Sequence, residues 1–218
     1  MWKAGGQKSS ARIYGGVEAA NHSIPWQVAI YDFNVDRDYP VCGGTLISQL
    51  HVLSAAHCFD EPSNLSRYNV IVQRHELTPY DHLKNYMVRP GHISIHPKYK
   101  KVCGKAEIPE WDFSILHFRP GFKKQMPLNK KLIPACLPDD SMGGNFLEGK
   151  DLTVSGWGEP YPDILHKATI PGASNDNCTT YIDTHNCPVD STNMMCAGNL
   201  TDRKVGDALG DSGGSIQC

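Results

Sequence analysis

The chain has 218 residues, of which 40% are hydrophobic and 20% charged, and a formal net charge of −2. This balance is typical of a folded domain, and without a basic tract it gives no support to nucleic-acid binding. No run of about 18 consecutive apolar residues occurs, so the sequence predicts no membrane-spanning helix and no membrane partner.

Eight cysteines are many for a chain of this length, and none of them forms a Cys-x-x-Cys pair. The pattern favours disulfides formed in an oxidising compartment over a zinc or redox site. Four N-glycosylation triplets agree, beginning at Asn21, Asn64, Asn177 and Asn199. We therefore predict a secreted, extracellular protein. Residues 1–12 lack the apolar segment of a signal peptide, so a signal has been removed or the chain is one part of a longer secreted polypeptide.

In chain order, residues 1–12 are small and polar and are predicted to form a flexible leader. Short β-rich runs separated by glycine, proline, asparagine and aspartate follow from Ile13 onward. This alternation favours an all-β barrel or sandwich over βαβ units. A short helical turn is predicted over residues 54–58, and a boundary between two halves of similar size over residues 120–138. The clearest predicted strands cover residues 26–31, 44–47, 68–73, 113–118 and 152–155.

Residues 210–214, Gly-Asp-Ser-Gly-Gly, give the sharpest local signal. Glycines after a serine let the backbone turn tightly and bring its N–H groups close to a bound substrate. The string also fits the G-x-S-x-G pattern of α/β-hydrolases, but those enzymes place the acid and the histidine after the serine. Only six residues follow Ser212, so any catalytic partners must precede it. The string alone is equally typical of a structural glycine-rich turn.

A serine nucleophile needs a base, and His57 is the best candidate among ten histidines. Two alanines precede it and a cysteine follows, which favours a rigid and crowded backbone. His92 and His96 lie in a run that alternates with period two, which predicts one strand face rather than a metal site. His75 is followed by glutamate but not by the second histidine of a zinc-protease helix. The sequence therefore predicts no metal site and no cofactor.

Asp112 is the candidate for the acid that orients the base. It opens the apolar run of residues 113–118, and a carboxylate buried there needs a charged or hydrogen-bonding partner. An imidazolium would be such a partner. Taken alone, Asp112 could equally be a turn residue that begins a strand.

Together these pieces resemble the chymotrypsin/trypsin family of serine peptidases from Ile13 to Cys218. Nine motifs occur in the family's order, which is far more specific than any one of them. They are Ile13-Tyr-Gly-Gly16 after Arg12, Pro25-Trp-Gln27, Cys42-Gly-Gly-Thr-Leu-Ile47, Leu53-Ser-Ala-Ala-His-Cys58, Asp112 before an apolar strand, Ala135-Cys-Leu-Pro138, Val154-Ser-Gly-Trp-Gly158, Met195-Cys-Ala-Gly198 and Gly210-Asp-Ser-Gly-Gly214.

The resemblance implies two antiparallel β-barrels of the six-stranded type with the active site between them. The peptidase domain would cover residues 13–218, with the first barrel at about 13–125 and the second at about 126–218. Ser212 would be the nucleophile, His57 the base and Asp112 the acid that holds the histidine tautomer. The N–H groups of Gly210 and Ser212 would form the oxyanion hole. The implied partners are protein or peptide substrates.

The resemblance also implies activation by cleavage between Arg12 and Ile13. The freed Ile13 amine would pair with Asp211 and organise the oxyanion loop, which is a buried ion pair biasing a two-state element. Tyr14 stands where the family usually has a small β-branched residue, so we expect the new N-terminus at Ile13 to fit less tightly when it inserts. The alternative for Arg12 is a surface charge in the leader.

Substrate preference depends on how residues 205–212 align with the family, because a cysteine usual there is absent. Without a gap, Gly206 would form the pocket base and Ala208 would replace the cysteine. With the cysteine deleted, Asp207 falls at the base with Ala208 beside it. We favour the second alignment, in which Asp207 pairs with arginine or lysine of the substrate.

Two family disulfides are implied for the cysteines, Cys42–Cys58 and Cys178–Cys196. Cys103 and Cys187 are unusual, but they fall in loops that adjoin each other in this fold, so we predict a third pair. Cys136 matches the cysteine by which many mosaic proteases hold an upstream chain. Cys218 matches a cysteine whose usual partner position is Leu152 here.

The family continues past the position of Cys218 with further strands and a helix. We therefore expect an incomplete second barrel with exposed edges and a poorly active or inactive 218-residue chain. Two rival interpretations are a non-catalytic binding module on the same fold and a secreted disulfide scaffold. All three candidate catalytic residues are present, which argues against the first, and the scaffold leaves the motifs unexplained.

Overall fold

Strands dominate the part of the chain that the computed structural model describes. That part comprises residues 16–77, 87–102, 108–122, 128–139, 142, 146–159, 161–174, 194–198 and 211–217. The strands are β1 (Val17–Glu18), β2 (Gln27–Asp32), β3 (Cys42–Ser48), β4 (His51–Ser54), β5 (Tyr68–Ile71), β6 (Met87–Val88), β7 (His92–Ile95), β8 (Lys100–Val102), β9 (Ile108–Glu110), β10 (Ser114–His117), β11 (Asp151–Gly156), β12 (His166–Ala173), β13 (Cys196–Ala197) and β14 (Ile216–Gln217). One short 3₁₀ helix, η1 (Ala56–Cys58), follows β4.

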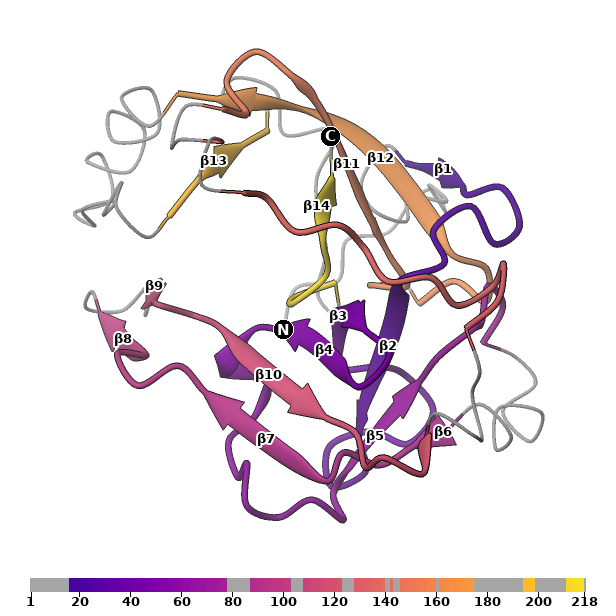
Figure 1. The fold of residues 1–218 in the computed structure, drawn as a ribbon. Coiled ribbons are helices and arrows are strands. Elements are labelled where there is room, and N and C mark those ends of the chain that lie inside the picture. The colour runs from indigo at the N-terminus through magenta and orange to yellow at the C-terminus, as the bar shows by residue number, and fades with distance from the viewer. Residues whose placement is uncertain are drawn as a thin grey trace, which may run out of the picture.

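Two larger sheets and one hairpin organise these strands. The first sheet has the order β6-β5-β2-β3-β4-β10-β7, and the second has the order β1-β12-β11-β14 with β13 also paired to β12. Strands β8 and β9 form the hairpin. Figure 1 shows the first sheet, indigo to magenta, in the lower half and the second, mostly orange, above it. The all-β architecture expected from the sequence is confirmed.

Strand β2 shows how the two halves are joined, because all six of its residues are buried. Val28 and Ile30 face the core of the first sheet. The alternate residues Ala29 and Tyr31 face a second cluster, which we call the junction core, because alternate side chains of a strand point to opposite faces. The junction core contains Ala19, Ile24, Ala29, Tyr31, Ile71, Leu77, Trp157 and Leu165.

Short segments cross from each half of the chain to the other sheet. Strand β1, near the N-terminus, pairs antiparallel with β12 in the second sheet. In the opposite direction, Leu132 is fully buried in the core of the first sheet, and Ala135 N–H donates to Leu46 C=O at 2.8 Å. The two sheets are thus linked by a segment that precedes the strands of the first sheet in the sequence and by a segment that follows them.

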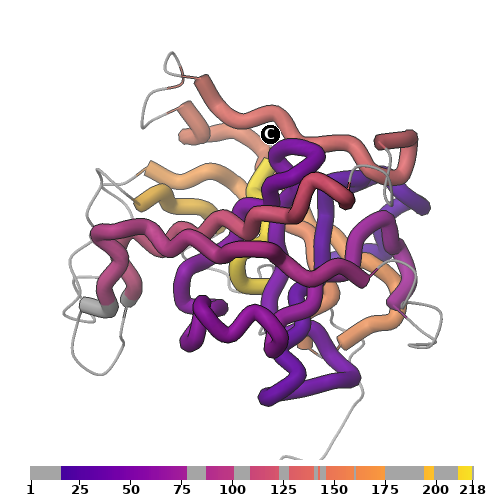
Figure 2. The backbone as a smooth tube through the Cα atoms, turned by 60° about the horizontal axis from the view of Figure 1, so that its bottom comes forward, coloured from indigo at the N-terminus to yellow at the C-terminus, as the bar shows by residue number. Residues whose placement is uncertain are grey.

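The C-terminal segment with Ser212 lies between the two sheets. It is drawn in yellow and runs between the indigo-to-magenta and orange parts in both Figure 1 and Figure 2. Strand β14 pairs with β11 of the second sheet, while the N–H of Gly43 in β3 donates to Ser212 C=O at 2.8 Å. The candidate nucleophile is therefore held at the meeting point of the halves.

Candidate active site

His57 lies in η1, where buried neighbours fix its backbone. Ala56 and Cys58 on either side are buried, and the predicted disulfide between Cys42 and Cys58 is present, with a Cα–Cα separation of 6.2 Å. This bond fastens η1 to β3. With both neighbours in the core, the His57 side chain is left partly exposed, at 35% of its full area.

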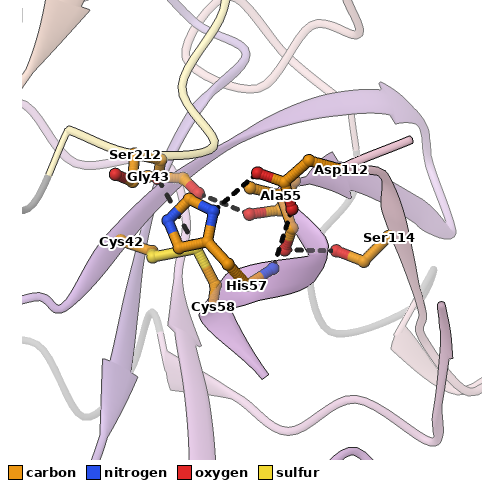
Figure 3. Close-up of a disulfide and its surroundings, with 9 residues drawn as sticks. Cys42, Gly43, Ala55, His57, Cys58, Asp112, Ser114 and Ser212 are labelled. Atoms are coloured by element: carbon orange, nitrogen blue, oxygen red, sulfur yellow. Dashed lines mark hydrogen bonds and ion pairs between the residues drawn. A yellow bond between two sulfur atoms is a disulfide. The ribbon is translucent and has the colours of Figure 1, made fainter. Parts of the chain in front are cut away.

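Asp112 contacts His57 through both carboxylate oxygens (Figure 3). Its Oδ2 lies 2.6 Å from His57 Nδ1, and its Oδ1 accepts the His57 backbone N–H at 2.8 Å. One hydrogen bond holds the ring and the other holds the turn that carries it. Because Nδ1 faces the carboxylate, Nε2 is the ring nitrogen left for another group.

The pKa of Asp112 is lowered below its ordinary value of 3.8. Burial desolvates the carboxylate and by itself raises the pKa. Hydrogen bonds from the His57 ring and backbone, the charge of His57 and a hydrogen bond from the Ala56 backbone together outweigh that effect. The site thus keeps Asp112 ionised and favours an Nδ1–H tautomer of His57.

Trp111, directly before Asp112, was not singled out by the sequence analysis. Its φ is +55°, a left-handed conformation that costs energy for a bulky residue. The Trp111 ring stacks on His96 with centroids 4.9 Å apart, and Lys98 Nζ lies 4.8 Å from the Trp111 ring centroid. These contacts hold the strained turn that aims Asp112 at His57.

Two buried serines brace the strands around the site, and sequence reasoning missed both. Ser114 Oγ at the start of β10 donates to Ala55 C=O at 2.9 Å. Ser54 Oγ at the end of β4 donates to Gly43 C=O at 2.8 Å. Their signal in the sequence is a hydroxyl at an inward position of an apolar strand, where it needs a partner.

The turn with Ser212 requires the glycine that follows it. Gly213 has φ +81°, and a Cβ there would lie 2.8 Å from Gly43 O and 2.9 Å from Ala55 N. The turn is closed by Gly214 N–H donating to Asp211 C=O at 3.0 Å. The glycine-rich pattern read from the sequence is therefore needed for a tight approach to β3 and to the residue before η1.

Ser212 lies beside His57 across the disulfide. Cys58 Sγ is 3.8 Å from Ser212 C=O, and one nitrogen of the His57 ring lies within 4.8 Å of the Cys58 sulfur. In Figure 3 the His57 ring stands between Asp112 and Ser212. No hydrogen bond between Ser212 Oγ and the His57 ring is formed within the described residues, and such bonds are often long or misaligned without substrate.

Asp211 is buried, at 7% of its full area, next to the nucleophile turn. Its Oδ1 accepts the Gly158 N–H at 2.7 Å. A Cβ at Gly156 or at Gly158 would collide with this carboxylate. The sequence motif of residues 154–158 therefore has a role that sequence reasoning did not give it, which is to make room for Asp211.

Cys42, His57 and Cys58 come close enough together to suggest a metal site. The two sulfurs are joined to each other in the disulfide, so neither can bind an ion as a thiolate. The imidazole alone does not make a site.

Several residues named by the sequence analysis lie outside the described part of the chain. They are Arg12, Ile13, Cys103, Cys178, Cys187, Gly206, Asp207, Ala208, Gly210 and Cys218. Cys196 is disulfide-bonded. Cys136 is exposed and not disulfide-bonded. The described residues form no helix that is long and apolar enough to cross a membrane.

Comparison with known proteins agrees with this geometry. The family model described as Trypsin matches residues 13–218. The chain belongs to the trypsin family. Transmembrane protease serine 9 of Rattus norvegicus is 30% identical over 217 residues, and Chymotrypsin-C of Mus musculus is 30% identical over 217 residues. Ovochymase-2 of Mus musculus is 28% identical over 213 residues.

The match covers nearly all of this trypsin-family chain but differing shares of its relatives. It takes in 97% of the chain and 18% of transmembrane protease serine 9. For Ovochymase-2 the shares are 95% and 32%, and for Chymotrypsin-C they are 96% and 73%. The chain thus spans less than a third of the length of the first two relatives.

Proposed function

We propose that the chain is the catalytic domain of a serine endopeptidase with His57, Asp112 and Ser212 as its triad. The observation that carries this proposal is the double contact of Asp112 with the ring and backbone of His57, at 2.6 and 2.8 Å. A carboxylate that fixes the tautomer of a partly exposed imidazole is the arrangement that general-base catalysis requires. Ser212, on the other side of the ring, is the group to be activated.

In the proposed reaction, Ser212 Oγ attacks the carbonyl carbon of the substrate peptide bond while His57 Nε2 takes the hydroxyl proton. The new Oγ–C bond persists as an ester when the C–N bond breaks, and His57 gives its proton to the leaving amine. Water then attacks the ester carbonyl carbon while His57 takes a proton from it. The Oγ–C bond breaks, the carboxylic acid product leaves, and His57 gives the proton to Ser212 Oγ. Backbone N–H groups of Gly210 and Ser212 would stabilise the oxyanion in both halves of the reaction.

We further propose activation by cleavage between Arg12 and Ile13. The new Ile13 ammonium would pair with Asp211, whose buried carboxylate sits in the space left by Gly156 and Gly158. The adjacency of the two residues in the sequence supports this role, since Asp211 directly precedes Ser212. An ion pair at Asp211 would therefore set the position of the Ser212 N–H.

Cleavage after arginine or lysine, selected by Asp207 with Ala208 beside it, is the proposed preference. Asp207→Gly should then lower kcat/KM for arginine substrates by at least about 10²-fold, since a charge pair in a desolvated pocket is lost. A competing outcome is faster turnover of phenylalanine or leucine substrates by the unaltered protein. That result would favour the alignment with Gly206 at the pocket base.

The setting proposed for the domain is extracellular. The Cys42–Cys58 disulfide is typical of oxidising compartments. Cys136, an exposed thiol in this chain, would bond to a cysteine of an upstream chain. Mass spectrometry of the native protein under non-reducing conditions tests this, because a peptide carrying Cys136 should be found linked to a peptide from outside residues 1–218.

Peptide hydrolysis tests the proposed activity. The protein that carries these residues, cut between Arg12 and Ile13, should cleave a denatured protein substrate, and Ser212→Ala should abolish cleavage while leaving the thermal midpoint of unfolding nearly unchanged. A protein that binds such substrates but never cleaves them would instead favour the binding-module interpretation.

A further inference from the structure

Three histidines lie directly opposite one another on three adjacent strands of the first sheet. His117 of β10 is paired with His51 of β4 and with His92 of β7. The ring centroids of His51 and His117 are 5.1 Å apart, and those of His92 and His117 are 5.4 Å apart. We call these three residues the histidine row; Figure 1 shows the three strands side by side.

The histidine row faces out of the core. The next residue toward the interior on each strand, Val52, Leu116 or Ile93, is buried, and neighbours along a strand point to opposite faces. His92 is exposed on the edge strand, and the other two rings are partly buried. An ion from solvent can therefore reach all three imidazoles.

Serine hydroxyls engage one nitrogen of two of the rings. Ser48 Oγ lies 2.7 Å from His51 Nδ1, and Ser94 Oγ lies 3.0 Å from His117 Nε2. This leaves His51 Nε2, His117 Nδ1 and both nitrogens of His92 without hydrogen bonds among the described residues. A hydrogen bond to the second nitrogen is what orients an imidazole that binds a metal.

We propose that His51, His92 and His117 form a binding site for a divalent transition-metal ion of the Zn²⁺ class. Three imidazole nitrogens with water in the remaining position are an established zinc environment. Directly opposed residues have Cβ atoms about 4.5–5.5 Å apart, so one ion above His117 is within reach of both outer rings. The nitrogens do not all lie within 4.8 Å of one another, so binding requires the exposed His92 ring to turn toward the other two.

The site has a structural consequence for the candidate active site. Strand β4 runs directly into the turn that carries His57, and Asp112 lies two residues before β10. An ion shared by His51 and His117 would tie these two strands together. The ion should therefore raise the thermal midpoint of unfolding as well as bind.

Equilibrium dialysis of the full chain against Zn²⁺ in a non-chelating buffer tests the proposal. The unaltered protein should hold one more equivalent of Zn²⁺ than His117→Asn or His92→Asn, and its midpoint of unfolding should rise with Zn²⁺ only when the row is intact. Ser94→Ala should weaken the binding about 10–100-fold, the usual effect of losing an orienting hydrogen bond.

His22→Asn is the matched control. It removes one histidine outside the row at a residue with φ +57°, a conformation that asparagine tolerates, and it should bind like the unaltered protein. Near-UV circular dichroism without added metal checks that each variant is folded. Because His92 is exposed on an edge strand, His92→Asn should disturb the packing least. Equal Zn²⁺ stoichiometry and affinity in the unaltered protein, His92→Asn and His117→Asn would overturn the proposal, as would no binding at all.

Discussion

Asp112 has two roles in the candidate site, because each of its carboxylate oxygens makes a separate contact with His57. Its two oxygens hold the ring and the backbone of His57, so the orientation of the imidazole and of the turn depend on the same carboxylate. The pKa of Asp112 is lowered because these hydrogen bonds outweigh desolvation. Since a lowered carboxylate pKa stabilises the folded state only while the group is ionised, the contact has a consequence for stability as well as for catalysis.

Asp112→Asn should reduce the acid sensitivity of folding. The stabilisation from the lowered pKa is fully present above about pH 5 and is lost as the pH falls through 3.8 toward the folded-state pKa. The difference in unfolding free energy between the unaltered protein and Asp112→Asn should therefore shrink on acidification. Chemical denaturation at a series of pH values measures it.

The matched control for this change is Asp151→Asn, which removes an exposed carboxylate with no hydrogen bond to His57. Its unfolding free energy should follow that of the unaltered protein on acidification. A difference between the unaltered protein and Asp112→Asn that stayed constant down to about pH 2 would show that the His57 contact contributes nothing to the pH dependence.

At the scale of elements, the site is an assembly of strand ends and turns. Strand β4 leads into η1, β10 begins after Asp112, and the turn of residues 211–214 docks on β3. Alternation and turn residues predicted β2, β3, β5, β10 and β11 to within a few residues, and the helical turn predicted over residues 54–58 contains η1. Local patterns of this kind depend on neighbours in sequence.

Pairing register could not be predicted, because it depends on contacts between strands far apart in the sequence. His92 illustrates this: the sequence suggested a relation to His96, whereas the register sets His92 opposite His117. Trp111 is a second case, since its left-handed conformation is accompanied by packing against His96 and Lys98, which are distant enough in sequence to escape a local pattern. The space that Gly156 and Gly158 leave for Asp211 likewise joins parts of the chain more than 50 residues apart.

Gly213→Ala should damage the nucleophile turn more than an equally left-handed glycine elsewhere. Gly213 has φ +81° with Gly43 and Ala55 packed against the Cβ position, whereas Gly149 has φ +70° with nothing within 4 Å. Gly149→Ala should cost about 1–2 kcal/mol from the backbone conformation alone. Gly213→Ala should cost more and also slow peptide hydrolysis. Equal unfolding free energies for the two variants would contradict the close packing of this turn.

At the scale of the whole molecule, we expect the two sheets to unfold together as one cooperative unit. The junction core packs side chains of β2 against Trp157 and Leu165. Backbone bonds cross the same boundary, from Leu77 N–H to Asp163 C=O and from Leu165 N–H to His75 C=O, each 2.8 Å long. Ser155 Oγ donates to Gln27 Oε1 at 2.8 Å in a buried position. Loss of the junction should therefore weaken both sheets together.

Leu165→Ala should lower the free energy of unfolding by about 2–5 kcal/mol, because it opens a cavity at a residue only 2% exposed. Unfolding followed by tryptophan fluorescence and by far-UV circular dichroism should still give one coincident transition. The matched control is Leu137→Ala, 57% exposed, which should change stability by less than about 0.5 kcal/mol. Two separate transitions in Leu165→Ala would show that the sheets unfold independently.

The most direct test of the proposed triad is the reaction of the protein with a fluorophosphonate, read by mass spectrometry of its peptides. After cleavage between Arg12 and Ile13, the protein that carries this domain should acquire one adduct per chain, located on Ser212. The adduct should be absent from Ser212→Ala and strongly slowed in His57→Ala. An adduct on another residue, or peptide hydrolysis that persists in Ser212→Ala, would contradict the assignment of Ser212 as the nucleophile.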